Sequence, residues 1–456
     1  MSSKEHYKIF GTDGVRGRAN HFPMTVEVAL ALGRSAGKMF RRHKGRHRVV
    51  IGKDTRRSCY MFENALIAGL CSMGVDTLMV GPLPTPGVAF LTRAYRADAG
   101  IVISASHNPY YDNGIKFFSP DGFKLSNEWE EEMERNLELC DFSDDLPGDA
   151  EIGRNTKVHD AQGRYIELAK AVYPRGLTLD GFKIALDCAN GSAYTVAPLI
   201  FTELGGDVIT YGVQPNGLNI NDNCGALHPE NVRNAVLKHQ ADIGIALDGD
   251  GDRLILVDEL GNIIDGDQIL AICAMNMMER KMLRGNRLVL TSMSNLGIVK
   301  HLNEIGIQTI FSDVGDRHVI EKMIEEDANL GGEQSGHLIF LDHNTTGDGL
   351  VSALQVLSIL KERGTTLSEL AGQFLKYPQI CLNVKVSQKP PLESLPNTQN
   401  AIDKATKKLG EEGRVFVRYS GTEDLLRVMV EAKEGEVVEE LATSIANAAK
   451  EEIGER

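Results

Sequence analysis

The sequence of 456 residues has few cysteines for its length, and their arrangement does not suggest a cross-linked or zinc-binding protein. The cysteines number seven, are widely scattered and form no C-x-x-C pair. Disulfide frameworks and zinc ribbons need closely spaced sets, so the pattern argues against both and fits a reducing, cytoplasmic location. A chain of this length can bury a large core without such links.

The sequence also lacks an apolar targeting segment and an excess of positive charge. The first residues, MSSKEHYKIFGTDG, contain no apolar stretch typical of a secretory signal, and no run of about 18 apolar residues occurs anywhere. We therefore expect no membrane span. The formal net charge is −14, which disfavours nucleic acid or an anionic membrane as a partner. If the substrate is an anion, the groups that bind it must be clustered locally.

The sequence does contain a repeated alternation of β-rich runs and amphipathic helical runs. In its first part we expect a helix at residues 58–74 and strands at 47–54, 75–81 and 97–106. The alternation recurs at 181–212 and 287–316, and residues 241–267 predict two strands around an acidic loop. This βαβ pattern is typical of a largely parallel sheet that is covered on both faces.

The C-terminal part differs in composition. Residues 377–400 are rich in Pro, Ser and other polar residues, and they predict a strand followed by a linker. The pattern after this linker predicts a helix, two strands around a loop and a final helix. The predicted fold class is therefore α/β, with three similar mixed α/β domains followed by a smaller α+β C-terminal domain. We place these domains at residues 1–157, 158–256, 257–372 and 373–456.

The first chemically informative segment is IVISASHNP, which contains Ser106. An apolar strand delivers this serine into a loop at the carboxyl end of the strand, where ligands bind in open α/β sheets. A serine hydroxyl becomes a good nucleophile only when neighbouring groups assist the loss of its proton, and His107, Lys116 and a bound metal are the nearby candidates. The alternative is that Ser104, Ser106 and Asn108 only satisfy backbone groups of the loop.

The second segment is DGDGDR, in which Asp248, Asp250 and Asp252 alternate with glycines and Arg253 follows. Carboxylates at this spacing project to one side of an extended segment, and their mutual repulsion calls for a cation. Oxygen ligands and a phosphate substrate favour Mg²⁺. An EF-hand is rejected, because Arg253 stands where that loop needs Gly and the flanks are strand-like. A solvated acidic turn is disfavoured by the apolar strands on both sides.

The third segment, RYSGTEDLLR, has the composition of a phosphate-binding turn. It offers the Ser420 and Thr422 hydroxyls and backbone N–H groups around Gly421, and Arg418 and Arg427 flank it. An ordinary hairpin loop is the alternative.

Weaker signals come from three further loops. GGEQSGH offers Glu333 and Ser335, whose polar ends suit sugar hydroxyls. GTDGVRGR, which contains Arg16, and KDTR, which ends at Arg56, could each hold an anion. Taken separately, each of these loops is better explained as a turn.

Together, the segments resemble the α-D-phosphohexomutases, and most closely their phosphoglucosamine mutase branch. The matching pieces, in order, are FGTDGVRGR, GIVISASHNPYYDNGIKFF, ALDGDGDRLILVD, GGEQSGH and RYSGTEDLLRV. The resemblance implies four domains around a central cleft. It also implies interconversion of glucosamine 6-phosphate and glucosamine 1-phosphate through a phosphoserine and a 1,6-bisphosphate, which feeds UDP-N-acetylglucosamine and cell-wall precursor synthesis.

The resemblance also implies roles for individual residues. Ser106 would carry the phosphoryl group, and one Mg²⁺ would be bound by Ser106, Asp248, Asp250 and Asp252. The residues implied around the reacting hydroxyl are Arg16, His107, Lys116 and His337. The residues implied in substrate binding are Arg253, Glu333, Ser335, Arg418, Ser420, Gly421, Thr422 and Arg427. Glucosamine or glucose 1,6-bisphosphate is a candidate activator, and a homodimer is a candidate assembly.

Three alternative functions stay open at this point. A phosphomannomutase or phosphoglucomutase of broader specificity would use the same residues. A metal-dependent sugar phosphatase, with Asp248 or Ser106 as the nucleophile, would release free phosphate. A non-catalytic sugar-phosphate-binding protein would bind its ligand without isomerising it, and it would not need all three aspartates.

Overall fold

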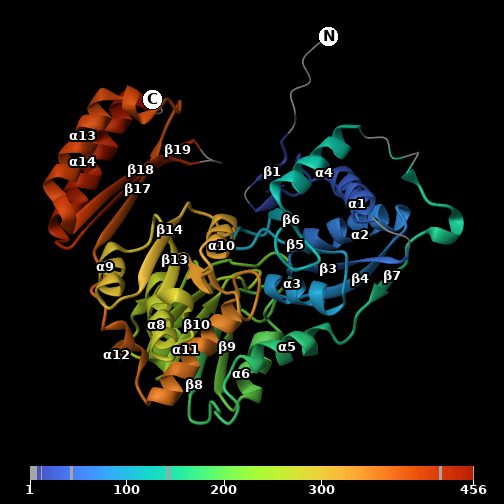
Figure 1. Ribbon diagram of the computed structural model, residues 1–456, viewed down its shortest axis with the longest axis horizontal. Coiled ribbons are helices and arrows are strands. Elements are labelled where there is room, and N and C mark those ends of the chain that lie inside the picture. The colour runs from blue at the N-terminus through green and yellow to red at the C-terminus, as the bar shows by residue number, and fades with distance from the viewer. Residues whose placement is uncertain are drawn as a thin grey trace. The chain divides into compact units, whose positions relative to one another are not determined.

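The computed structural model describes residues 8–11, 13–41, 45–139, 142, 145–420 and 424–454 (Figure 1). The chain divides into two compact units. The first consists of residues 1–292 and 310–371, and the second of residues 293–309 and 372–456. No helix among the described residues is long and apolar enough to cross a membrane.

The first sheet has the strand order β1-β2-β6-β5-β3-β4-β7. Its strands are β1 (Phe10–Gly11), β2 (Gly14–Arg18), β3 (His47–Lys53), β4 (Val75–Pro82), β5 (Ala99–Ile103), β6 (Asp112–Phe118) and β7 (Asn155–Lys157). Strands β5, β3, β4 and β7 are parallel, whereas β1, β2 and β6 are antiparallel. The expectation of a largely parallel sheet is wrong for this edge, because the short loop after β5 returns the chain without a crossover helix.

Helices cover both faces of this sheet. They are α1 (Val26–Phe40), α2 (Arg57–Ser72), α3 (Thr85–Ala94) and α4 (Asn127–Leu139). Val49 and Ile51 of β3 pack into a core with α1, α2 and α4. Gly52 faces α3, so closely that a Cβ there would lie 2.3 Å from a methyl carbon of Val88. Strands buried on both faces explain the continuous apolar runs in the sequence.

The second sheet has the order β12-β11-β10-β8-β9. Its strands are β8 (Lys183–Asp187), β9 (Asp207–Tyr211), β10 (Ile243–Leu247), β11 (Leu254–Asp258) and β12 (Ile263–Ile264), and its helices are α5 (Ala161–Ala171), α6 (Val196–Glu203) and α7 (Glu230–His239). Strands β10 and β11 form a fully buried antiparallel hairpin, in which Leu247 pairs with Leu254. This pairing closes the acidic loop between them.

The third sheet has the order β14-β13-β15-β16. Its strands are β13 (Arg287–Thr291), β14 (Gln308–Ser312), β15 (Leu330–Gly332) and β16 (Leu338–Phe340). The helices of this part are α8 (Gly266–Glu279), α10 (Asp316–Glu325), α11 (Gly349–Arg363) and α12 (Leu367–Ala371). Asp348 begins α11 as its N-cap, because its carboxylate accepts hydrogen bonds from the N–H groups of Leu350 and Val351.

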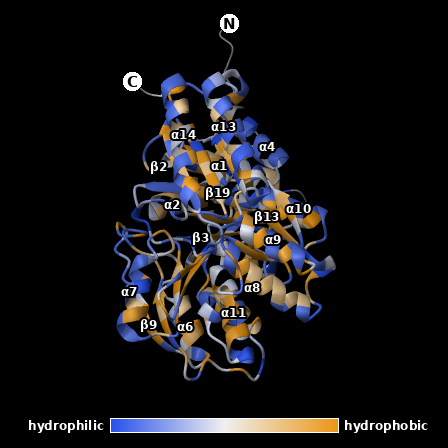
Figure 2. Cartoon of the chain, turned by 90° about the vertical axis from the view of Figure 1, so that its left-hand side faces the viewer, coloured by the Kyte–Doolittle hydropathy of each residue, from blue (hydrophilic) through white to orange (hydrophobic). Residues whose placement is uncertain are grey.

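The second unit is built on the antiparallel sheet β17-β19-β18. Its strands are β17 (Gln379–Lys385), β18 (Gly413–Tyr419) and β19 (Leu425–Ala432), and its helices are α9 (Leu296–Glu304), α13 (Pro396–Leu409) and α14 (Glu436–Ile453). Val438, Leu441, Ala442 and Ile445 give α14 a buried apolar stripe, and Figure 2 shows hydrophilic and hydrophobic residues mixed along this helix. The predicted small α+β C-terminal domain is confirmed.

Short 3-10 turns connect some of these elements. They are η2 (Asp149–Glu151), η3 (Arg284–Asn286), η4 (Leu392–Ser394) and η5 (Gly410–Glu412).

Candidate active site

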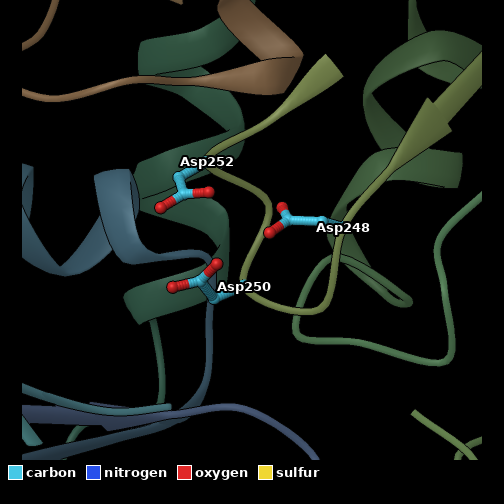
Figure 3. A group of neighbouring side chains, drawn as sticks. All are labelled: Asp248, Asp250 and Asp252. Atoms are coloured by element: carbon cyan, nitrogen blue, oxygen red, sulfur yellow. The ribbon is translucent and has the colours of Figure 1, made fainter. Parts of the chain in front are cut away.

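The carboxylates of Asp248, Asp250 and Asp252 converge in the loop between β10 and β11, as Figure 3 shows. Each residue offers one oxygen, and these oxygens lie within 4.8 Å of one another. The loop is a tight turn, with φ of +70° at Gly251, and not the extended segment that the spacing suggested. Within the described residues, no other group of three or more His, Cys, Asp or Glu side chains is this close.

The donor set fits a divalent metal. All three aspartates are buried, and Oδ1 of Asp250 and Oδ1 of Asp252 accept no hydrogen bond from any described residue. Burial, followed by repulsion from the other two carboxylates, raises the pKa of Asp248 well above its usual range. Burial and the charge of Asp250 likewise raise the pKa of Asp252. A hard cation would satisfy the orphaned oxygens and neutralise this repulsion.

The loop after β5 brings Ser106 to the same aspartates. Its Oγ donates a hydrogen bond of 2.6 Å to Oδ2 of Asp248, and it lies 3.3 Å from Nδ1 of His107. Ser106 is buried and has φ of 50°, a left-handed conformation that is uncommon for serine. A hydroxyl and an acidic triplet that are 142 residues apart therefore meet in one place.

A fully buried arginine, Arg56, holds the Ser106 loop in shape. Its Nε donates to Asp54 over 2.8 Å, and its Nη2 donates to the carbonyl oxygens of Ser106 and Asn108 over 3.0 and 2.7 Å. Its Nη1 donates to two further carbonyl oxygens of the same loop. All five guanidinium N–H donors are thereby engaged. The sequence context of Arg56 suggested a surface turn or an anion-binding loop. Both suggestions are wrong, because Arg56 is buried and its donors are engaged within the protein.

Replacing Arg56 with Met is expected to destabilise the protein strongly, because the buried Asp54 carboxylate loses its cationic partner and four carbonyl oxygens each lose one donor. Removing one partner of a buried ion pair typically costs about 3–5 kcal/mol. We expect a loss of this size in the free energy of unfolding, measured by urea denaturation. Arg48→Met on the exposed side of β3 is the control, and it should stay within about 0.5 kcal/mol of wild type. Equal stabilities of the two variants would contradict this role for Arg56.

Two cations of the first sheet lie against the acidic loop. Lys116 Nζ is 2.9 Å from Asp250, 3.6 Å from Asp252 and 3.2 Å from Asp13. Burial would lower the pKa of Lys116, but these three carboxylates outweigh it and raise that pKa, so the side chain is an ammonium. Arg16 pairs with the same Asp13. The site therefore opposes its acidic triplet with fixed positive charge.

His107, Arg253 and His337 lie around the same loops. Burial, followed by the charges of Arg253 and Arg16, lowers the pKa of His107 to about 3, so this ring is neutral. Arg253 forms a β-bridge with His337, whose buried ring lies with Nε2 4.0 Å from Asp252. The predicted residues of the first three sheets are thus gathered in one place.

The predicted sugar-binding loop connects β15 and β16. Oε1 of Glu333 accepts a hydrogen bond of 2.9 Å from the N–H of Gly315, and Oε2 accepts one of 3.4 Å from the exposed Ser335 hydroxyl. The loop docks on the acidic hairpin, because the N–H of Leu254 donates to the carbonyl of Gly336 over 2.9 Å. This contact brings Glu333 and Ser335 to the side of the aspartates.

In the second unit, Arg418 of β18 and Arg427 of β19 stand directly opposite each other. Like charges at paired positions disfavour a sheet unless an anion offsets them. The N–H of Ser420 donates to the carbonyl of Leu425 over 2.8 Å and so helps to close the hairpin. The phosphate-binding role of this turn stays a prediction. The other two predicted members, Gly421 and Thr422, lie outside the described residues.

Three further charged residues of the site were not predicted from the sequence: Asp13, Lys124 and Asp316. Lys124 Nζ pairs with both Asp13 and Asp316. The second of these pairs spans 192 residues and joins a loop after β6 to the start of α10. No local pattern links such positions, so this pairing could not be predicted from one sequence.

Comparison with known proteins gives matches along nearly the whole chain. Models of the phosphoglucomutase/phosphomannomutase family match four ranges: alpha/beta/alpha domain I at 7–143, domain II at 164–261, domain III at 265–377 and the C-terminal domain at 382–448. The chain is 61% identical to a phosphoglucosamine mutase of Protochlamydia amoebophila, over 100% of this chain and 99% of that protein. It is 57% identical to the phosphoglucosamine mutase of Chlamydia caviae, over 99% of each chain.

Solved structures show the same fold. A phosphoglucomutase/phosphomannomutase family protein from Burkholderia thailandensis has a TM-score of 0.80 and 25% identity, covering 97% of both chains. An Aspergillus fumigatus N-acetylphosphoglucosamine mutase, solved in complex with GlcNAc-6P and magnesium, has a TM-score of 0.67 and 18% identity, covering 97% of this chain and 96% of that one. This chain belongs to the phosphoglucomutase/phosphomannomutase family and, within it, to the phosphoglucosamine mutases.

Proposed function

We propose that this protein interconverts glucosamine 6-phosphate and glucosamine 1-phosphate through a phosphorylated Ser106. The observation that carries the proposal is the 2.6 Å contact between the Ser106 hydroxyl and Asp248, a member of a triplet suited to a metal. Relatives at 57 and 61% identity over the whole chain are phosphoglucosamine mutases, which favours this substrate over the alternatives.

In the proposed reaction, the phosphoryl group of Ser106 passes to O1 of glucosamine 6-phosphate. The bond from phosphorus to Oγ breaks, the bond to O1 forms, and the O1 proton passes by way of a neighbouring base to Oγ. The resulting 1,6-bisphosphate then turns within the site. The bond from phosphorus to O6 breaks, the bond to Oγ forms again, and the Oγ proton passes to O6. Glucosamine 1-phosphate leaves, and the phosphoserine is restored.

The residues around Ser106 have separate tasks in this scheme. Lys116 and Arg16 stabilise the negative charge of the phosphoryl group, which is where most catalysis of phosphoryl transfer lies. His107 lies 3.3 Å from Oγ, so it is the nearest candidate to accept or return a proton. His337, whose Nε2 lies 4.0 Å from Asp252, is the second candidate.

We propose Mg²⁺ as the ion of the acidic triplet, with Asp248, Asp250, Asp252 and an oxygen of the serine phosphate as its ligands. When bound, this ion supplies Lewis-acid stabilisation of the phosphoryl oxygens. The complex of the A. fumigatus enzyme with magnesium supports this choice. A sugar 1,6-bisphosphate would act as activator, because either of its phosphoryl groups can charge a free Ser106.

The remaining predicted residues bind the substrate. Arg253, Glu333 and Ser335 would bind the sugar end. The non-reacting phosphate would be held by Arg418, Ser420, Gly421, Thr422 and Arg427.

Arg418→Met or Arg427→Met is expected to raise the KM for glucosamine 6-phosphate by about 10–100-fold. The reason is that a hydrogen bond to a charged group typically contributes about 1.5–3 kcal/mol. Initial rates over a range of substrate concentrations measure the change. Lys404→Met, which removes an exposed cation from α13, is the control and should leave KM unchanged. An unchanged KM in both arginine variants would exclude this turn from phosphate binding.

Phosphorus NMR of the protein with glucosamine 6-phosphate, Mg²⁺ and a trace of glucose 1,6-bisphosphate tests the proposed function. We expect a sugar 1-phosphate resonance to appear without inorganic phosphate. Stoichiometric release of inorganic phosphate would instead identify a phosphatase. Ligand binding without any new resonance would identify a binding protein.

A further inference from the structure

Lys124 is a buried cation that the proposed reaction does not use. It lies in the connection between β6 and α4, and only 8% of its side chain is exposed. Its Nζ pairs with Oδ1 of Asp13 and with Oδ2 of Asp316. We call these three residues the Lys124 bridge.

One end of the Lys124 bridge leads to the cations that face the acidic loop. Oδ2 of Asp13 pairs with Arg16 and lies 3.2 Å from Nζ of Lys116. Lys116 in turn contacts Asp250 over 2.9 Å. Asp13 therefore pairs with both cations that oppose the aspartates.

The other end leads to the third sheet. Oδ2 of Asp316 lies 3.6 Å from Nε2 of His337. The residue before it, Gly315, donates its N–H to Glu333 of the predicted sugar-binding loop over 2.9 Å. The start of α10 therefore contacts both His337, a candidate proton-transfer group, and Glu333, a candidate sugar-binding group. Lys124 ties this helix start to the sheet carrying Ser106 through Asp13, which lies between β1 and β2.

Opposite charges alternate without a break from Asp316 through Lys124 and Asp13 to Lys116, and the His337 ring lies beside Asp316. Without Lys124, the carboxylates of Asp13 and Asp316, whose side chains are 20% and 13% exposed, would lose the ammonium between them. Their repulsion would then drive them apart. The groups at both ends of the bridge would move with them. A misplacement of about 1 Å that originates far from the chemistry can cost about 10²-fold in rate.

We propose that Lys124 is a positioning residue for phosphoryl transfer. By joining Asp13 to Asp316, it sets the separation between Lys116 and Arg16 on one side and His337 and Glu333 on the other. The inference rests on the proposed function, and it predicts an effect on kcat without contact between Lys124 and the substrate.

Two variants separate positioning from plain stability. Lys124→Met is expected to lower both Tm and kcat, with kcat falling by about 10²-fold and KM changing little. Lys124→Met combined with Asp316→Asn removes one of the two stranded carboxylates. This double variant should recover most of the lost Tm, but its kcat should stay low because the tie is still missing.

A matched control exists at the same end of α10. Glu130 of α4 and Arg317 of α10 form a buried ion pair of 2.5 Å that contacts none of the bridge carboxylates through its side chains. Glu130→Gln combined with Arg317→Gln should lower Tm and leave kcat close to wild type.

The inference is overturned if kcat recovers together with Tm in the bridge double variant, or if the control loses kcat as severely as Lys124→Met. Lys124 would then act only on stability. The wild-type protein in the same assay separates this failure from a failure of the proposed function, because only the latter leaves the wild type without turnover.

Discussion

Ser106→Ala is expected to abolish turnover, with kcat lower by at least about 10⁴-fold, the size of loss seen when a covalent nucleophile is removed. Both phosphoryl transfers of the proposed reaction use Oγ of Ser106, first as the leaving oxygen and then as the nucleophile. The variant keeps the loop, because Arg56 and Asn221 hold it through the backbone carbonyl of residue 106 and not through the hydroxyl. The loss should therefore appear in kcat without a matching fall in stability. Coupled-assay rates and thermal unfolding of the same preparation measure both quantities.

Ser192→Ala is the matched control for this experiment. Ser192 is also buried, and its N–H donates to the carbonyl of Gly249 in the acidic loop over 2.8 Å. Its hydroxyl makes no hydrogen bond to any described residue. We expect activity close to wild type for Ser192→Ala. An active Ser106→Ala variant would contradict the phosphoserine mechanism outright.

Asp252→Asn is expected to remove most of the stabilisation that a divalent cation gives to the protein. A ligand that binds only the folded state at 100 times its Kd stabilises it by about 2.7 kcal/mol. Wild type should therefore show a higher Tm when Mg²⁺ is added, and the variant should show little change. In EDTA, the Tm of the variant should equal or exceed that of wild type, because the variant lacks one of three buried like charges. Turnover should fall by about 10³-fold, the loss expected for one group that stabilises transition-state charge.

Asp258→Asn provides the control for charge removal near the same hairpin. Asp258 is buried at the far end of β11, and its Oδ1 accepts hydrogen bonds from the N–H groups of Leu260 and Asn262, which an Asn side chain can also accept. Its Mg²⁺-dependent rise in Tm should equal that of wild type. A full Mg²⁺ response in Asp252→Asn would place the cation elsewhere.

The sequence predicts well those parts of the fold that depend on local pattern. The strands at β3 and β10, the acidic hairpin and the final helix follow from short apolar runs and their polar boundaries, within a few residues. The antiparallel edge of the first sheet was missed. Whether β6 returns beside β5 depends on the length and shape of one loop, and not on the hydrophobicity of the strand itself.

The candidate site likewise contains residues that local sequence patterns predict and residues that they do not. Ser106 and the three aspartates stand in short segments whose composition already favours their chemistry. Arg56 escaped recognition because its partners are backbone carbonyls, which have no signature in side-chain sequence. One clue was present, since β3 and β5 are parallel neighbours and the residues after them emerge at the same edge.

The limits of the four domains and the roles of individual site residues stay predictions. Each role depends on which groups face one another across the substrate.

A crystal structure of the phosphorylated protein with Mn²⁺ in place of Mg²⁺ tests whether Ser106 and the three aspartates share one metal ion. We predict one anomalous peak from a single Mn²⁺ ion. Its ligands should be an oxygen of phosphorylated Ser106 and a carboxylate oxygen from each of Asp248, Asp250 and Asp252. Phosphate on a different side chain, or a Mn²⁺ peak that lies away from this loop, would contradict the account.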